Sequence, residues 1–213
     1  MFSVRVGWAA RVDAGEEFDA RGFCVGDLVG DGTTRVASGS LGGILRIFRP
    51  SLQEYSLDDL ELEEQLDEPV LQLACGRFAG SEGVLSLAVL HPQKLAVYGV
   101  AAAREGGGAL ALEPRYVHTL CDGDDQHFSA ANMVFGPFGS VRGRDFIAVQ
   151  SLDGKLRVFE QESAAFSRQL NHVLLPGPMA YLRKQDAMLV CNSQFQVDCY
   201  KYSLLASSTS RTG

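Results

Sequence analysis

The chain has 213 residues, of which 46 % are hydrophobic and 21 % charged, and its formal net charge at pH 7 is −7. This composition is that of a folded globular domain and excludes disordered and membrane-spanning classes, since no apolar run approaches the ~20 residues that a spanning helix needs. The acidic balance argues against nucleic acid as the main partner, because phosphate binding requires clustered lysine and arginine.

The N-terminal segment contains the single tryptophan, Trp8, within residues 2–12. Arg5, Arg11 and Asp13 interrupt its apolar residues, so no secretory signal is visible and we expect an intracellular protein. Trp8 is predicted to anchor an entry strand.

Residues 27–35 resemble a calcium loop, in which Asp27 and Asp31 would supply carboxylate oxygens. Val29 is apolar and the closing position is Arg35, a cation, so the loop fits calcium poorly. A turn built from aspartate and glycine is the favoured interpretation. A calcium-dependent, integrin-type propeller stays open as the alternative.

A β-hairpin is predicted at residues 35–48, which read RVASGSLGGILRIF. Two runs rich in β-branched residues flank Gly42 and Gly43. Glycine supplies the positive φ that both central residues of a type I′ turn require.

An acidic stretch follows, with eight acids and no base between Glu54 and Glu68. It accounts for the whole net charge, since −7 without these eight acids becomes +1. A solvated loop and edge strand is the favoured interpretation, and a docking strip for a basic partner is the alternative. Residues 57–66 have a helical composition but fit a strand nearly as well.

A second, weaker hairpin is predicted at residues 85–98, with His91 in its turn. The connecting segments after it are predicted loops. Gly106–Gly108 lacks the lysine and hydroxyl residue of a phosphate cradle, which favours a linker. Asp122, Asp124 and Asp125 could act as acid and base, but hydrated loop residues are the favoured interpretation.

The strongest repeat is the hairpin predicted at residues 146–159, which is identical to residues 35–48 at seven of 14 positions. Its turn contains Asp153 and Gly154, another hairpin signal. A fourth hairpin is predicted at residues 187–200. The repeated Arg46 and Arg157 are expected to have a structural role, such as bridging blades.

A glycine precedes each of the first three hairpins, at Gly26, Gly76 and Gly136. These glycines predict close backbone approach, as expected of innermost strands that crowd a central axis. Several strands are apolar on both faces, which indicates sheets covered on both sides. Repeating hairpins in such sheets are what propeller blades require.

The sequence therefore predicts an all-β fold: residues 1–213 form an incomplete β-propeller of four-stranded antiparallel blades. Blades of about 40–60 residues make this about four blades of a seven-bladed ring. An open arc leaves apolar faces and strand edges in water, so we expect the isolated chain to aggregate.

Catalytic, cofactor-binding and metal residues are not predicted. The four histidines (His91, His118, His127 and His172) lack the spacing of metal ligands, and no nucleophile elbow, phosphate loop or zinc-protease motif is present. The five cysteines (Cys24, Cys75, Cys121, Cys191 and Cys199) are predicted to be reduced and mostly buried, without pairs spaced for zinc. Partner-binding residues are left unassigned.

Six segments resemble the N-terminal propeller of the Bardet–Biedl syndrome protein nine family, also called the parathyroid hormone-responsive family. They are VASGSLGGILRIF (36–48), EPVLQLACGRF (68–78), LAVLHPQKLAVY (87–98), FGSVRGRDFIAVQSLDGKLRVFEQESAAF (138–166), LLPGPMAY (174–181) and QVDCYKYSLLA (196–206). The resemblance is colinear from residue 16 to residue 206, and it departs in the loops 54–67, 102–113 and 122–129.

The resemblance implies a seven-bladed propeller in a non-enzymatic scaffold subunit of the BBSome, a coat-like complex that carries membrane proteins into and out of cilia. It implies the other BBSome subunits as partners and indirect contact with the ciliary membrane, without nucleic acid, cofactor or small-molecule substrate. The expected location is the cytoplasm, the cilium, its base and the centrosomal region.

Overall fold

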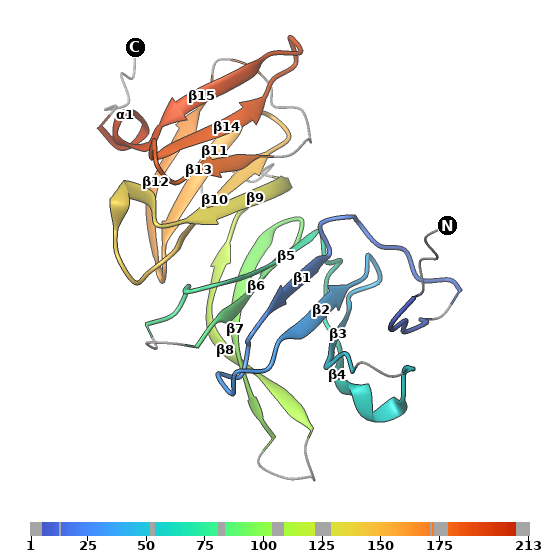
Figure 1. The fold of residues 1–213 in the computed structure, drawn as a ribbon. Coiled ribbons are helices and arrows are strands. Elements are labelled where there is room, and N and C mark those ends of the chain that lie inside the picture. Colours follow the sequence, from blue (N-terminus) through green and yellow to red (C-terminus); the bar gives the residue numbers. More distant parts are fainter. Residues whose placement is uncertain are drawn as a thin grey trace, which may run out of the picture.

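The structure is a computed structural model that describes residues 6–12, 14–51, 54–80, 84–103, 109–121, 129–170, 172 and 179–207. These residues form four antiparallel sheets, each a meander of consecutive strands, which follow one another as propeller blades (Figure 1). The predicted all-β propeller class is confirmed.

The first three blades have four strands each, and the described part of the fourth has three. Blade 1 contains β1 (Phe23–Gly26), β2 (Arg35–Gly39), β3 (Ile44–Phe48) and β4 (Leu60–Gln65). Blade 2 contains β5 (Gln72–Gly76), β6 (Ser86–Leu90), β7 (Lys94–Ala102) and β8 (Leu110–Thr119). Blade 3 contains β9 (Ala130–Gly136), β10 (Phe146–Ser151), β11 (Lys155–Glu160) and β12 (Ser163–Gln169). Blade 4 contains β13 (Ala180–Leu182), β14 (Ala187–Cys191) and β15 (Val197–Lys201).

Among the described residues, helical structure is confined to short segments: the 3-10 turns η1 (Leu57–Asp59) and η3 (Phe138–Ser140), and α1 (Tyr202–Ser207). Residues 57–66, which fitted a helix or a strand, divide between η1 and β4. Ser56 caps η1, and its backbone N–H donates to the Asp59 carboxylate at 3.0 Å.

The turns of two predicted hairpins differ from the type I′ geometry that the sequence suggested. Gly43 and Gly154 have positive φ, of 85° and 86°, whereas Gly42 and Asp153 do not. The Gly43 N–H donates to the carbonyl of Ser40 at 3.0 Å. These loops are longer than two residues, so one glycine in the left-handed region suffices to return the chain.

The close approach expected at the innermost strands is present, since β1, β5 and β9 end at Gly26, Gly76 and Gly136. A Cβ on Gly26 would lie 3.1 Å from the Cβ of Cys75 in the next blade, and one on Gly136 would collide with the Tyr181 ring. At Gly26 and Gly136 glycine therefore lets neighbouring blades meet, whereas a Cβ on Gly76 would collide with the Phe78 ring of its own blade.

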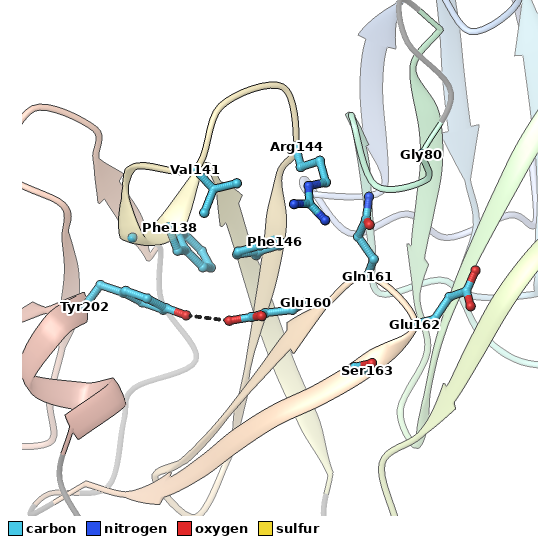
Figure 2. Close-up of a pocket in the computed structure, with 11 residues that line it drawn as sticks. Gly80, Phe138, Val141, Arg144, Phe146, Glu160, Gln161, Glu162, Ser163 and Tyr202 are labelled. Atoms are coloured by element: carbon cyan, nitrogen blue, oxygen red, sulfur yellow. Dashed lines mark hydrogen bonds between the residues drawn. The ribbon is translucent and has the colours of Figure 1, made fainter.

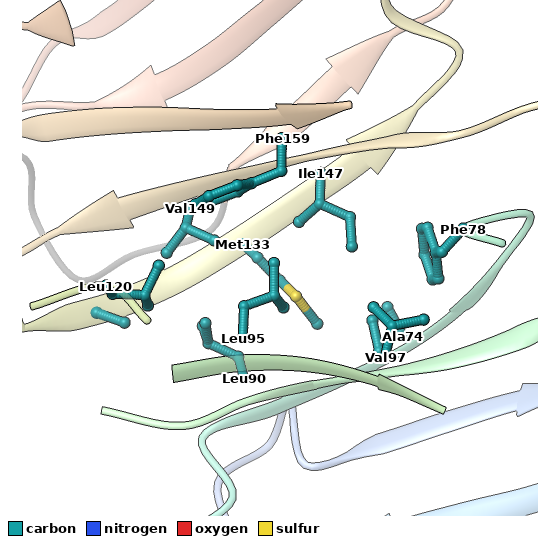
Figure 3. Packing of buried hydrophobic residues seen from close by; sticks show 12 residues of the cluster. Ala74, Phe78, Leu90, Leu95, Val97, Leu120, Met133, Ile147, Val149 and Phe159 are labelled. Atoms are coloured by element: carbon teal, nitrogen blue, oxygen red, sulfur yellow. The ribbon is translucent and has the colours of Figure 1, made fainter. Parts of the chain in front are cut away.

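The hydrophobic core lies between blades rather than within one sheet. Blades 2 and 3 share a cluster in which Leu95 and Val97 of β7 face Met133 and Ile147 (Figure 3). Similar clusters join blade 1 to blade 2 and blade 3 to blade 4. Each blade thus buries its faces against its neighbours, as strands apolar on both faces require.

One hydrogen bond recurs in the first three blades. The residue after the last strand donates its N–H to the turn between the second and third strands: Leu66 to Gly43 at 2.8 Å, Leu120 to Gln93 at 2.8 Å and Leu170 to Gly154 at 3.1 Å. It fixes where the chain leaves each blade and starts the next.

Blade 2 differs from the others in the length of its third and fourth strands. The pairing of β7 with β8 continues to Ala102 and Leu110, and the resulting hairpin extends beyond the rest of the blade (Figure 1). The central hairpin therefore spans residues 86–102, longer than the 85–98 range expected.

Candidate functional site

A cavity of about 640 Å³ lies where blades 3 and 4 meet, with Gly80 of blade 2 at its edge (Figure 2). Phe138 of η3 and Phe146 of β10 form an apolar wall. The turn between β11 and β12 contributes Glu160 and Glu162, and α1 contributes Tyr202.

Two polar groups of this cavity are hydrogen-bonded to each other. The Tyr202 hydroxyl donates to Oε1 of Glu160 at 3.1 Å (Figure 2). Burial, together with this hydrogen bond, raises the pKa of Tyr202, so the phenol stays protonated. The lining has no histidine or cysteine among the described residues.

A second cavity, of about 310 Å³, lies beside the first and shares Val141 and Arg144 with it. We call it the arginine pocket, after four of its lining residues, Arg77, Arg142, Arg144 and Arg183; Asp145 lines it as well. They come from the loops after β5 and β9 and from the turn between β13 and β14. Sequence reasoning missed this site, although the Arg142–Arg144 run was a visible signal.

The two aspartates of the calcium-like loop are already engaged. Arg35 donates to both carboxylate oxygens of Asp31, at 2.8 and 2.9 Å, and to Glu61. Its hydrogen bonds lower the pKa of Asp31. The Asp27 carboxylate accepts the N–H groups of Gly30 and Gly32, at 2.7 and 2.8 Å.

Within the described ranges, no three His, Cys, Asp or Glu side chains are grouped as metal ligands would be. The arrangement at residues 27–35 is an ion-paired turn, with Arg35 buried where a calcium loop would place its closing acid.

The histidines have separate surroundings. His91 is buried, and its Nδ1 lies 2.9 Å from the carbonyl of Pro69. Burial lowers the pKa of His91. His118 stacks on Phe159, with ring centroids 4.4 Å apart, and lines a third cavity of about 330 Å³ together with Arg157. His172 is half-buried.

Several predicted positions lie outside the described residues. They are His127, the Asp122, Asp124 and Asp125 cluster, and Gly106–Gly108. Nothing in the structure bears on their proposed interpretations as catalytic groups or linkers.

Arg46 and Trp8 hold the N-terminal segment on blade 1. Arg46 donates to both carboxylate oxygens of Glu16, each at 2.7 Å, and to Glu63 at 2.6 Å. The Trp8 indole N–H donates to Asp59 at 3.0 Å, and its ring packs edge-on against Phe48. Trp8 thus anchors the entry segment as expected, although residues 6–12 form no strand.

The acidic stretch is only partly a solvated loop and edge strand. Leu57 and Glu63 are exposed, but Asp59 and Glu61 are buried beneath Trp8 and Arg35. Two of the eight acids of this stretch are therefore engaged in contacts within the fold.

The cysteines are free thiols, but the expectation that most are buried is wrong. Cys199 is exposed and the other four are half-buried. Cys24 and Cys75 face each other across the innermost strands of blades 1 and 2, with 2.9 Å between their sulfurs. Cys24 and Cys75 pack against the core shared by blades 1 and 2.

No helix in the described part of the chain is long and apolar enough to cross a membrane.

The comparison with family models matches the PTHB1 N-terminal family over residues 1–213. Protein PTHB1 of Xenopus laevis is 42 % identical over 218 residues, covering 98 % of this chain and 25 % of the frog protein. Human Protein PTHB1 is 41 % identical, with 98 % and 24 % covered. The chain therefore spans about a quarter of the length of these curated relatives.

Solved structures share the fold at low sequence identity. The N-terminal part of BBS1, crystallised in complex with ARL6, has a TM-score of 0.58 at 13 % identity, with 84 % of this chain and 50 % of that chain covered. The β-propeller domain of Cps50 (Swd1) from Myceliophteria thermophila has a TM-score of 0.58 at 11 % identity, with 78 % and 47 % covered. These similarities show the propeller fold.

Proposed function

Because the chain belongs to the PTHB1 N-terminal family, we propose that residues 1–213 are the front part of the N-terminal propeller of a non-enzymatic scaffold subunit of the BBSome. In this role the protein assembles with other BBSome subunits into a coat that carries membrane proteins into and out of cilia. The observation that carries the proposal is the family match over the whole chain.

The fold supports a scaffold role in physical terms. Blades that share continuous cores form a rigid body, and their connecting loops present separate surfaces at its two rims. BBS1, whose N-terminal part has this fold, was crystallised in complex with a protein, ARL6. We propose that this propeller likewise contacts proteins, and reaches the ciliary membrane only through the complex.

The proposed role includes no cofactor, nucleic acid or small-molecule substrate. The Asp31 carboxylate is held by Arg35, which does not favour a calcium-dependent role for the loop at residues 27–35. The proposed location is the cytoplasm and the cilium, including its base and the centrosomal region.

A pull-down from ciliated cells, read by mass spectrometry, tests the proposal. The tagged full-length protein is expected to bring down the other BBSome subunits. Residues 1–213 alone are expected not to, because they cover about half of a propeller. Failure of the full-length protein to bring down these subunits would contradict the proposed function while leaving the fold unaffected.

A further inference from the structure

The arginine pocket combines four cations in one small cavity, and all four are arginine rather than lysine. The planar guanidinium group presents paired N–H donors that match the two oxygens of a carboxylate or the oxygens of a phosphate. We propose that this pocket binds a carboxylate- or phosphate-bearing side chain in an acidic peptide segment of a partner protein.

The guanidinium groups are available because none of the four pocket arginines has an ion pair within the described ranges. Arg35 and Arg46, by contrast, each contact two carboxylates. Arg35 and Arg46 are thus fully paired with carboxylates, whereas the four pocket arginines are not.

The nearby aspartates are occupied by other donors. The Asp145 carboxylate accepts the main-chain N–H of Arg77 at 3.0 Å. Asp186 accepts the hydroxyl of Tyr181 at 2.7 Å and the N–H of Gly139 at 3.0 Å. Their charge reduces the positive potential, but Oδ2 of Asp145 and Oδ1 of Asp186 already accept hydrogen bonds from the loop backbones and a phenol.

The loops that carry the arginines are held in defined conformations. The N–H of Asp145 donates back to the carbonyl of Arg77 at 3.0 Å, which ties the loop of blade 3 to that of blade 2. Ser140 and Gly143 have positive φ, of 60° and 77°, as in tight turns. A loop ordered before binding loses less conformational entropy when a ligand arrives.

The surroundings favour a peptide over an anionic bilayer. The arginine pocket adjoins the larger cavity, with which it shares Val141 and Arg144, and the apolar wall of that cavity could take the next side chain of an extended segment. The equivalent loop of blade 1 carries Asp27 and Asp31, and the chain has a net charge of −7. A flat anionic membrane facing the side of the propeller that carries these loops would be repelled by Asp27 and Asp31. A single peptide in the arginine pocket would not contact them.

Fluorescence anisotropy on the full-length protein tests the proposal with labelled peptides of equal length: oligoglutamate, a phosphoserine counterpart and neutral oligoglutamine. We expect at least one acidic peptide to bind and the neutral one not to. The double variant R142Q/R144Q should weaken that binding by about tenfold or more. The control R49Q/R115Q removes two exposed arginines elsewhere and should leave it unchanged.

Further measurements separate recognition from loss of structure and from membrane binding. The variant R142K/R144K keeps both charges but loses the paired donors, so its affinity should be intermediate; full retention would overturn recognition by guanidinium geometry. Absence of acidic-peptide binding, or equal weakening by the control, would overturn the proposal.

A last measurement tests binding to vesicles of phosphatidylcholine with phosphatidylserine. Vesicle binding that R142Q/R144Q abolishes, without acidic-peptide binding, would overturn the proposal in favour of a membrane site. The inference does not depend on BBSome membership, since the peptide assay and the pull-down can fail separately.

Discussion

The side-chain amide of Gln72 in β5 forms two hydrogen bonds with the main chain of Met133 in β9. It donates to the Met133 carbonyl at 2.9 Å and accepts the Met133 N–H at 2.8 Å. One side chain thereby supplies to blade 3 the pair of bonds that a neighbouring strand would otherwise make. The contact joins the innermost strands of two blades.

Replacing Gln72 by leucine should loosen the junction of blades 2 and 3. Both main-chain groups of Met133 would lose their partner, at a cost of about 1–3 kcal/mol for each group that stays buried. Hydrogen-exchange mass spectrometry of the full-length protein should show faster exchange in β9. Gln185, an exposed glutamine, provides the matched control Gln185→Leu. Unchanged exchange in β9 of the Gln72 variant would refute the assignment.

Gly136→Ala should destabilise the contact between blades 3 and 4. The added methyl group would collide with the Tyr181 ring, and overpacking of this kind typically costs about 1–3 kcal/mol. Increased exchange in β9 and β13 is the expected readout. Gly80→Ala is the control, because a Cβ there meets no atom within 4 Å. Equal effects of the two variants would show that the collision does not matter.

Glu16→Gln should release the N-terminal segment from blade 1. Glu16 and Arg46 each have side chains 9 % exposed, so the change removes one carboxylate from a buried cation. Arg46 retains Glu63, so we expect a loss of roughly 3 kcal/mol, the lower end for a broken buried pair. Limited proteolysis should then cut within residues 14–18 more rapidly.

The control for that experiment is Glu113→Gln. The pair of Glu113 with Arg115 is about half exposed, and exposed pairs contribute about 0–1 kcal/mol. Cleavage of the N-terminal segment should match wild type in this variant. Resistance of Glu16→Gln to proteolysis would contradict the anchoring role of Arg46.

Acid should weaken blade 2 through His91. Burial holds its pKa below the ordinary 6.5, with Lys94 opposing protonation further and Glu68 favouring it. The unfolded chain therefore takes up the proton first, so this contribution is complete above pH 6.5 and declines as the pH falls below it. Protection of β6 and β7, measured as exchange relative to the intrinsic rate at the same pH, should fall as the pH drops from about 6.5 to about 5.5.

His91→Asn tests the assignment, since an asparagine amide can donate to Pro69 without titrating. Asn192 occupies the corresponding position after β14, buried and bonded to its own turn. The variant should lose the pH-dependent part of the exchange. A pH response equal to that of the wild type would assign it to another group.

The sequence repeat made much of the fold predictable, but it did not show which loops come together in space. The matching residues 35–48 and 146–159 pointed to equivalent sheets, and Gly26 and Gly136 to the crowded strand ends. The turn type was wrong because the pattern identifies a glycine but not the loop length around it. The pattern of apolar residues along a strand depends on local sequence, and it therefore predicts the sheets well.

The arginine pocket shows why the candidate site could not be predicted. Arg77 and Arg183 lie in different blades and become neighbours only because successive loops reach the same rim. Each looks like an ordinary surface arginine in its own segment. The buried acids Asp59 and Glu61 were missed for the same reason, since Trp8 and Arg35 reach them from other parts of the chain.

The long β7–β8 hairpin has a consequence for the propeller as a whole. Blades of one pattern give a propeller approximate rotational symmetry. A partner with a flat surface could therefore bind it in several nearly equivalent orientations. A hairpin that only blade 2 extends, among the three blades whose fourth strand is described, removes that equivalence. It marks one direction around the axis, and a partner that contacts it can dock in a single orientation.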